Sequence, residues 1–242
     1  MAAGAAALGT MIGTAPAQAQ AAAALTSASI STSSAVLDGD AGCSNRIKLS
    51  TTVYDPGSAN QNWALSAVVN GPRGERQWLA LTETTHSGDY RYLSDYIRLC
   101  GSSTPGAYTV DTAFEQWTTD RSQSHIVHKY QHFSVKRPTS LTYQVSPKSV
   151  KRGAQFSTAG VLKFDPYARG AYFGRSGVVL KFYFKATNAK KYVLKGNVVT
   201  GKNGKYVKKF QATTTGTWQV TYSGDGAHQS QTKYATVTVP RS

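Results

Sequence analysis

Apolar and polar residues alternate along most of the chain after residue 25, which is the period of strands buried on one face. The segment RIKLSTTVY (46–54) has buried-type residues at every second position. The segment GVVLKFYF (177–184) places four apolar residues on one face and leaves Lys181 and Tyr183 on the other. Helical periodicity is hard to find in the same region, so the pattern predicts an all-β protein.

Short turn motifs separate these runs at intervals typical of an antiparallel sandwich. They are Asp55-Pro56-Gly57, Asn70-Gly71-Pro72, Ser87-Gly88-Asp89, Asn203-Gly204 and Gly224-Asp225-Gly226. An Asn-Gly pair between alternating runs is the strongest short hairpin signal. We therefore expect Asn203-Gly204 to close a hairpin.

The chain also repeats itself. Segment 87–112 aligns with segment 202–224, because each has a glycine turn, an apolar strand and a later Gly-x-(Tyr/Trp)-x-Val motif. Two copies of about 105 residues suit two small sandwiches, and Pro138 interrupts strand pairing between them. We expect two tandem immunoglobulin-like antiparallel β-sandwiches, at residues 25–136 and 137–242. The linker is short, so the two units should touch.

Residues 1–24 are rich in alanine and glycine and carry no charge. The stretch is apolar enough for the core of a secretory signal peptide and too short for a membrane span. Its small residues favour cleavage after Ala19 or Ala21. The positively charged beginning of such a peptide is missing, which suggests a start further upstream. A disordered alanine-rich tail is the alternative, and in both cases we expect this segment to lie outside the fold.

The sequence holds two cysteines, Cys43 and Cys100. In an exported protein an even number of cysteines favours a disulfide, and two unrelated buried thiols are the alternative. In an immunoglobulin-like sandwich the strands that follow these cysteines run in the same direction on facing sheets. We therefore expect a bridge between the two sheets at one end of the first sandwich.

The net charge of +15 comes entirely from the second half of the chain. Residues 1–137 carry ten basic and ten acidic residues, whereas residues 138–242 carry seventeen basic and two acidic residues. Thirteen of the seventeen are lysines, which are less suited than arginine to bidentate phosphate recognition. The composition favours an anionic partner and argues against sequence-specific nucleic-acid binding.

Segment 181–210 holds nine lysines and no carboxylate. Strand alternation predicts that most of these lysines lie on the outer face of one sheet and at its hairpin tips. The predicted anion-binding residues are Lys181, Lys185, Lys190, Lys191, Lys205 and Lys209. Solvation, and protection of sheet edges by lysine, is the alternative explanation.

Three histidines cluster in HIVHKYQH (125–132). On a strand, His128 and His132 share a face and His125 lies opposite. The pair is a candidate for weak zinc or nickel binding, with polar residues on an edge strand as the alternative. No third ligand stands at a fixed spacing from it.

Catalytic motifs are missing from the sequence. There is no Gly-x-Ser-x-Gly motif and no glycine-rich phosphate loop. The carboxylates of the first half are scattered among turn and strand positions. We therefore expect neither an enzyme nor a cofactor, although an enzyme of unrecognised type with a site in the first sandwich stays open.

Several motifs in the second half form a family pattern. They are VSPKSVKRGAQFSTAGVLKF, VVLKFYFK, NGKYVKKF, TGTWQVTYSGD and ATVTV. Residues 140–240 resemble the immunoglobulin-like repeats of secreted actinobacterial proteins, and the first half resembles them only loosely. This resemblance implies a secreted β-sandwich and carries no catalytic residues.

Three functions are compatible with these patterns. The first is a secreted, extracellular, non-enzymatic binding or structural protein, associated with an anionic cell-wall polymer or an acidic polysaccharide through a lysine-rich face of the second sandwich. The second is a non-specific binder of polyanions or nucleic acid. The third is the unrecognised enzyme.

Overall fold

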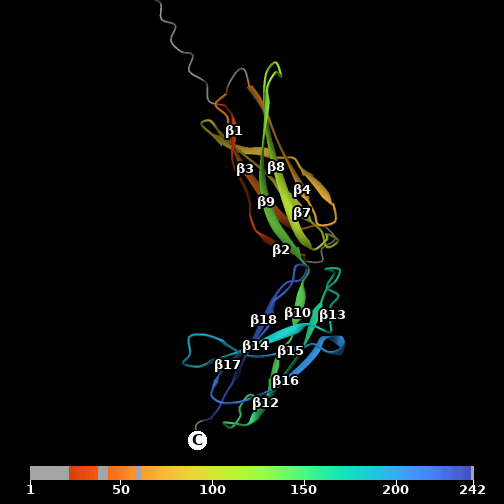
Figure 1. Cartoon of the computed structure of the whole chain (residues 1–242), viewed down its shortest axis with the longest axis vertical. Helices are drawn as coiled ribbons and strands as arrows, with labels where there is room; N and C mark the ends of the chain where they lie inside the picture. Colours follow the sequence, from red (N-terminus) through yellow and green to blue (C-terminus); the bar gives the residue numbers. More distant parts are fainter. Residues whose placement is uncertain (1–21, 38–42, 58–60, 241–242) are drawn as a thin grey trace, which may run out of the picture.

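The computed structural model describes residues 22–37, 43–57 and 61–240. It contains two β-sandwiches that lie one after the other along the long axis of the molecule (Figure 1). The predicted fold class is confirmed: the chain forms two tandem immunoglobulin-like sandwiches of mainly antiparallel strands. Within the described residues, no helix is long and apolar enough to cross a membrane.

The first sandwich pairs a sheet of order β1-β3-β7-β6 with a sheet of order β2-β9-β8-β4-β5. These orders correspond to the ABED sheet and the GFC-type sheet of the immunoglobulin fold. The strands are β1 (Ala24–Ile30), β2 (Ser34–Val36), β3 (Asn45–Tyr54), β4 (Gln61–Asn70), β5 (Arg76–Leu79), β6 (Thr82–Ser87), β7 (Tyr90–Leu99), β8 (Gly106–Thr118) and β9 (Ser124–Lys136).

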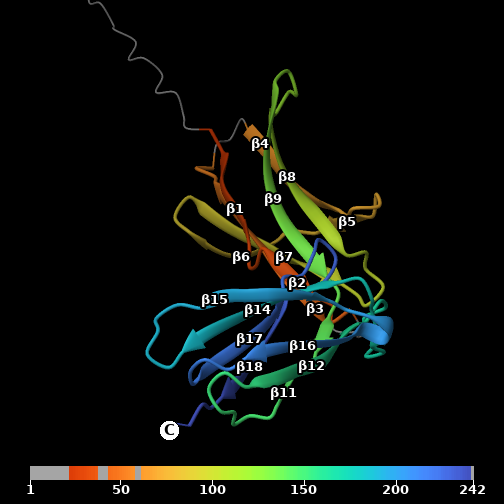
Figure 2. The same cartoon turned by 60° about the horizontal axis from the view of Figure 1, so that its bottom comes forward.

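The second sandwich has the same plan (Figure 2). One sheet has the order β15-β14-β17-β18, and in the other β12 pairs with β10, β11, β13 and β16. The strands are β10 (Thr139–Leu141), β11 (Gln144–Ser146), β12 (Gln155–Phe164), β13 (Phe173–Gly174), β14 (Val179–Ala186), β15 (Val193–Val199), β16 (Lys205–Gln211), β17 (Gly216–Tyr222) and β18 (Gln231–Val237).

Alternation along the strands builds both cores. In β3 every second residue from Ile47 to Val53 is at most 2% exposed. In β14, Leu180 and Phe182 are fully buried whereas Lys181 is exposed. The apolar pattern of the sequence therefore corresponds to the inner faces of the sheets.

The internal repeat is also visible in the strand pairing. Segment 87–112 contains β7 and β8, and segment 202–224 contains β16 and β17. In the first sandwich, β7 lies in the same sheet as β3, and β8 lies in the opposite sheet. In the second sandwich, β16 lies in the same sheet as β12, and β17 lies in the opposite sheet.

The expected hairpin at Asn203-Gly204 is wrong. β15 pairs with β14, whereas β16 pairs with β12, so this turn crosses from one sheet to the other. Asn203 and Gly204 both have positive φ, 58° and 72°, as an Asn-Gly turn requires. A Cβ at Gly204 would lie 2.0 Å from the carbonyl oxygen of Leu162. The glycine therefore lets the crossing turn lie directly against β12.

The disulfide between Cys43 and Cys100 is present, but its expected placement is wrong. The first residue of β3, Asn45, and the last residue of β7, Leu99, are partners in the same sheet. The bridge therefore joins the start of β3 to the end of β7 and does not link the two sheets. The reason is that Cys100 follows an antiparallel neighbour of β3 directly, whereas β8 begins only at Gly106.

The two sandwiches meet through side chains as well as through the linker. The guanidinium of Arg137 donates to the carbonyl oxygens of Gly101 (3.2 Å) and Ser103 (3.4 Å) in the first sandwich. Its backbone N–H donates to the carbonyl oxygen of Ala227 in the second (2.7 Å). Ala168 of the second sandwich is fully buried in the core of the first. The expected contact between the units is therefore observed.

The signal-like segment lies outside the described residues, except for its last three. Ala23 is buried and Ala24 pairs with Tyr54 at the start of β1. The expectation that the whole segment lies outside the fold is wrong at this end, because the edge of the first core needs these small side chains.

We expect the double substitution Cys43→Ser/Cys100→Ser to lower the free energy of unfolding of the first sandwich by about 4 kcal/mol. The reason is that the bridge closes a loop with a sequence separation of 57 residues, which restricts the unfolded chain. Urea unfolding of the parent and the variant measures the difference. Two alkylatable thiols in the folded, unreduced parent would contradict the bridge itself.

Candidate anion-binding site

The end of the second sandwich that points away from the first is its distal end. It consists of the connections 147–154, 187–192 and 212–215 and of residues 238–240. Five exposed cations lie on these connections: Lys148, Lys151, Arg152, Lys190 and Lys191. None of the described residues of the distal end is acidic.

The two carboxylates of the second half lie at the opposite end. β12 and β17 both start at the distal end, and Asp165 and Asp225 come after the strands have run toward the first sandwich. Asp165 is fully buried and accepts hydrogen bonds from the backbone N–H groups of Tyr167 and Gly170. The described distal end therefore holds cations and no carboxylate side chain, whereas both carboxylates of the joint-side half lie among further exposed cations such as Lys163 and Lys181.

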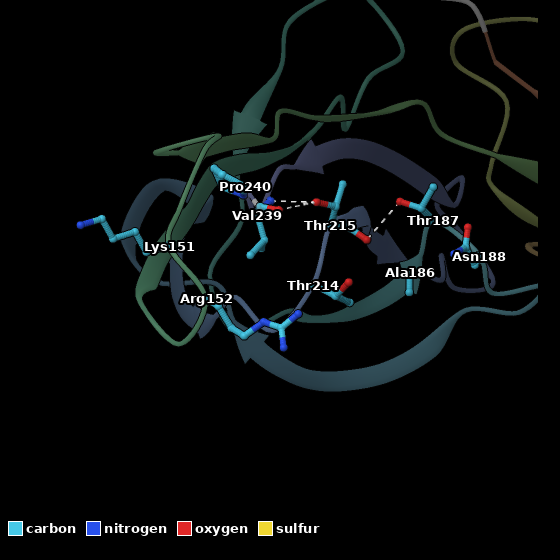
Figure 3. Close-up of a pocket in the computed structure, with 9 residues that line it drawn as sticks. All are labelled: Lys151, Arg152, Ala186, Thr187, Asn188, Thr214, Thr215, Val239 and Pro240. Atoms are coloured by element: carbon cyan, nitrogen blue, oxygen red, sulfur yellow. Dashed lines mark hydrogen bonds between the residues drawn. The ribbon is translucent and has the colours of Figure 1, made fainter. Parts of the chain in front are cut away.

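An open cavity of about 1280 Å³ lies at the distal end (Figure 3). Its lining combines two cations, three threonines and one amide with three small apolar residues. The residues are Lys151, Arg152, Ala186, Thr187, Asn188, Thr214, Thr215, Val239 and Pro240.

Thr215 holds the walls of this cavity together. Its hydroxyl accepts from the backbone N–H of Val239 (2.8 Å) and donates to the carbonyl oxygen of the same residue (3.1 Å). The hydroxyl of Thr187 donates to the carbonyl oxygen of Thr215 (3.2 Å). These bonds tie the connection after β14 and the end of the chain after β18 to the connection before β17.

The charged groups at the cavity are free to bind. Among the described residues, none accepts a hydrogen bond or forms an ion pair with the side chains of Lys151 and Arg152. Nor do the lining residues include a carboxylate, a thiol or a histidine that could act as a nucleophile or general base. The chemistry of this lining suits reversible binding of an anion.

The structure separates the predicted lysines into two groups. Lys181 and Lys185 lie on β14, and Lys190 and Lys191 follow in the connection that also supplies Thr187 and Asn188 to the cavity. Lys205 and Lys209 lie on β16, in the other sheet. The prediction of one continuous lysine face is therefore wrong, because the Asn203-Gly204 turn changes sheets.

Lys151 and Arg152 were not among the predicted site residues. They sit in the turn KRG between β11 and β12, in which Gly153 has a positive φ of 84°. A basic pair beside a turn glycine is too common to single out. Only the folded chain brings this turn beside the connection after β14.

The candidate metal residues lie on β9. The Nδ1 atom of His128 is 2.8 Å from the Asp111 carboxylate, and that of His132 is 3.3 Å from the Thr109 hydroxyl. The described part of the chain contains no group of three or more histidine, cysteine or acidic side chains placed to hold a metal ion. Each of the two histidines thus has a partner of its own on β8.

A smaller cavity of about 290 Å³ lies at the β8–β9 hairpin of the first sandwich. Glu115 is the carboxylate in its lining, beside Trp117, Arg121 and Ser124. A second acid, as paired-carboxylate chemistry requires, is not part of this lining.

No family model and no curated protein matches the chain. Among solved structures, a DUF4785 family protein from Legionella pneumophila is similar over 88% of this chain and 56% of its own, at 12% identity and a TM-score of 0.42. The chain therefore spans about half the length of that protein. A chimeric titin Z1Z2 tandem is similar over 91% of this chain and 100% of its own, at 11% identity and a TM-score of 0.33.

The D00-D0 domains of intimin are similar over 87% of this chain and 99% of their own, at 11% identity and a TM-score of 0.30. At these identities and TM-scores the likenesses carry no argument about function. The immunoglobulin-like assignment stands on the strand order.

The lowered pKa of Asp225 predicts that the stability of the second sandwich depends on pH. Burial alone would raise the pKa of Asp225, but hydrogen bonds from the N–H groups of Ala227 (2.8 Å) and His228 (2.7 Å), and the ring of His228, hold that pKa below its ordinary value. A lowered pKa contributes stability that is complete above the unfolded value of about 3.9 and is lost as the pH falls through the folded value. Its side chain is 52% exposed, so solvent screening limits the contribution to under about 1 kcal/mol.

We therefore expect Asp225→Asn to lower the urea midpoint of the second sandwich at pH 7 and to lower it by less at pH 2.5. Urea unfolding at both pH values measures this. The matched control is Asp89→Asn, at an exposed turn residue of the first sandwich. An equal loss at both pH values would show that the ionised form of Asp225 has no special role.

Proposed function

We propose that this chain is a secreted, non-enzymatic binding protein that attaches to an anionic extracellular polymer through the basic second sandwich. The polymer chemistry is that of a teichoic-type wall polymer or an acidic polysaccharide. The observation that carries this proposal is the group of exposed cations at the distal end of the second sandwich, where none of the described residues is acidic. Lys151 and Arg152 line a cavity whose lining has no acid, and Lys190 and Lys191 lie on the connection that supplies Thr187 and Asn188 to the same cavity.

The tandem immunoglobulin-like fold supports a binding or structural role. The disulfide supports an oxidising compartment, as outside the cell. The joint holds the first sandwich away from the distal end, which leaves the cations accessible to a surface or a long polymer (Figure 1).

The lysine-rich composition also supports a second candidate function, which is non-specific binding of polyanions. Such a protein would bind through its total charge, whereas a distal site would depend on where the charge is placed. The two candidates therefore predict different effects for variants that lose the same number of charges from different places.

We expect the distal variant, Lys151→Gln/Arg152→Gln/Lys190→Gln/Lys191→Gln, to bind immobilised polyphosphate and polygalacturonate more weakly than the parent full-length chain. The dependence of the affinity on salt should also fall, because fewer counterions are released. The measurement is the affinity of each polymer at several salt concentrations. Exposed substitutions of this kind usually change stability by under about 0.5 kcal/mol each, so the fold should be retained.

The matched control removes four exposed cations from the joint-side half of the second sandwich. It is the variant Lys163→Gln/Lys181→Gln/Lys202→Gln/Lys205→Gln. The proposal requires a clearly larger loss in the distal variant than in this control. Equal losses would favour a binder that acts by net charge, and unchanged binding in both would refute anion binding by the second sandwich.

A further inference from the structure

A second surface with binding chemistry lies on the first sandwich. Side chains of β7 alternate between the core and solvent, and Tyr90, Tyr92 and Tyr96 all point outward, with exposed fractions of 44%, 38% and 43%. Tyr54 on β3 is the cross-strand partner of Tyr90, and their ring centroids are 5.3 Å apart. We call these four residues the tyrosine face.

The surroundings of the tyrosine face are hydroxylic. Tyr92 pairs with Thr52 on one side and Thr85 on the other, and Ser94 pairs with Ser50 and Thr82. Among the described outward positions of β3, β6 and β7, none is Leu, Ile, Val, Phe or Met. Protein interfaces bury an apolar centre, so this composition fits a partner that is itself rich in hydroxyl groups.

One end of this sheet is positively charged. Arg46 on β3 is directly opposite Arg98 on β7, and Lys48 is directly opposite Tyr96. All three cations are exposed, and none forms an ion pair with a described residue. Like charges directly opposite each other destabilise a sheet, and a bound anion would remove that repulsion.

The acids at the other end are Asp55, Glu83 and Asp89, and they lie too far along the strands to pair with these cations. Asp55 lies 2.7 Å and Glu83 lies 3.0 Å from the guanidinium of Arg91, so both carboxylates are already paired. From Tyr90 to Arg98 the strand extends for about 27 Å. The surface is therefore long, with aromatic rings along it and cations at one end.

We propose that the tyrosine face binds an extended acidic polysaccharide. The C–H faces of its pyranose rings stack on Tyr90, Tyr92 and Tyr96, since a tyrosine offers a large apolar ring with a polar tip. Its carboxylate or sulfate groups reach Arg46, Lys48 and Arg98. This site is on a different sandwich from the distal end, and it stands whether or not the distal end binds anything.

The test uses the full-length distal variant as background, so that the distal cations do not contribute. We expect Tyr90→Ser/Tyr92→Ser/Tyr96→Ser to weaken binding of polygalacturonate about tenfold or more, because three stacking contacts are lost. Binding of polyphosphate, an anionic chain without sugar rings, should change less than twofold. The measurement is calorimetric titration of each polymer.

Three further variants control this result. Tyr90→Phe/Tyr92→Phe/Tyr96→Phe keeps the rings and should bind polygalacturonate within about threefold of the background protein. Tyr130→Ser removes an exposed tyrosine from the other sheet of the same sandwich and should have no effect. Arg46→Gln/Lys48→Gln/Arg98→Gln keeps the tyrosines and should weaken binding of polygalacturonate, which tests the proposal independently if the serine variant is unstable.

Four outcomes would overturn the proposal. They are unchanged polygalacturonate binding in the serine variant, an equal loss on polyphosphate, a loss in the phenylalanine variant as large as in the serine variant, and unchanged binding in the cation variant. A dimer that the serine variant dissociates, with polygalacturonate binding unchanged, would instead assign the face to contact between two copies of the chain.

Discussion

Contact between the inner faces of two sheets holds each sandwich together, and in one of the two core clusters of the second sandwich this contact centres on Trp218. Its ring centroid lies 4.4 Å from that of Phe210 and 5.1 Å from that of Phe156, both in the opposite sheet. Phe184, in the same sheet, lies 5.0 Å away. This sandwich has no disulfide, so its stability rests on the burial of these aromatic side chains.

One consequence is the distribution of charge. Because alternate positions face the core, Lys181 and Lys185 of β14 and Lys205 and Lys209 of β16 point outward, on opposite sheets. The connections at the distal end add Lys151 and Arg152, while Asp225 is used near the joint. The same constraint in the first sandwich directs the tyrosines of β7 to solvent. The side chains that these strands contribute to the two proposed surfaces thus occupy the outward positions that alternate with core residues.

The disulfide has a related role in the first sandwich. It joins the ends of β3 and β7 close to the facing pair Arg46 and Arg98. These two side chains repel each other, and the bridge holds their strands in register in the absence of an anion. At the same end the carbonyl oxygens of Gly101 and Ser103 accept hydrogen bonds from the guanidinium of Arg137. The disulfide, the facing cations and the joint between the sandwiches therefore lie at the same end of the first sandwich.

The sequence alone determined the all-β class, the tandem plan, the disulfide partners and the outward direction of residues such as Lys181, because a two-residue period and a repeat are local signals. It could not decide which strands share a sheet. An Asn-Gly pair predicts a local turn and not the partner of the next strand, so Lys205 and Lys209 were assigned to the wrong sheet. The distal cavity and the pairing of Arg46 with Arg98 were decided only by the tertiary structure, since both depend on segments far apart in the chain meeting in space.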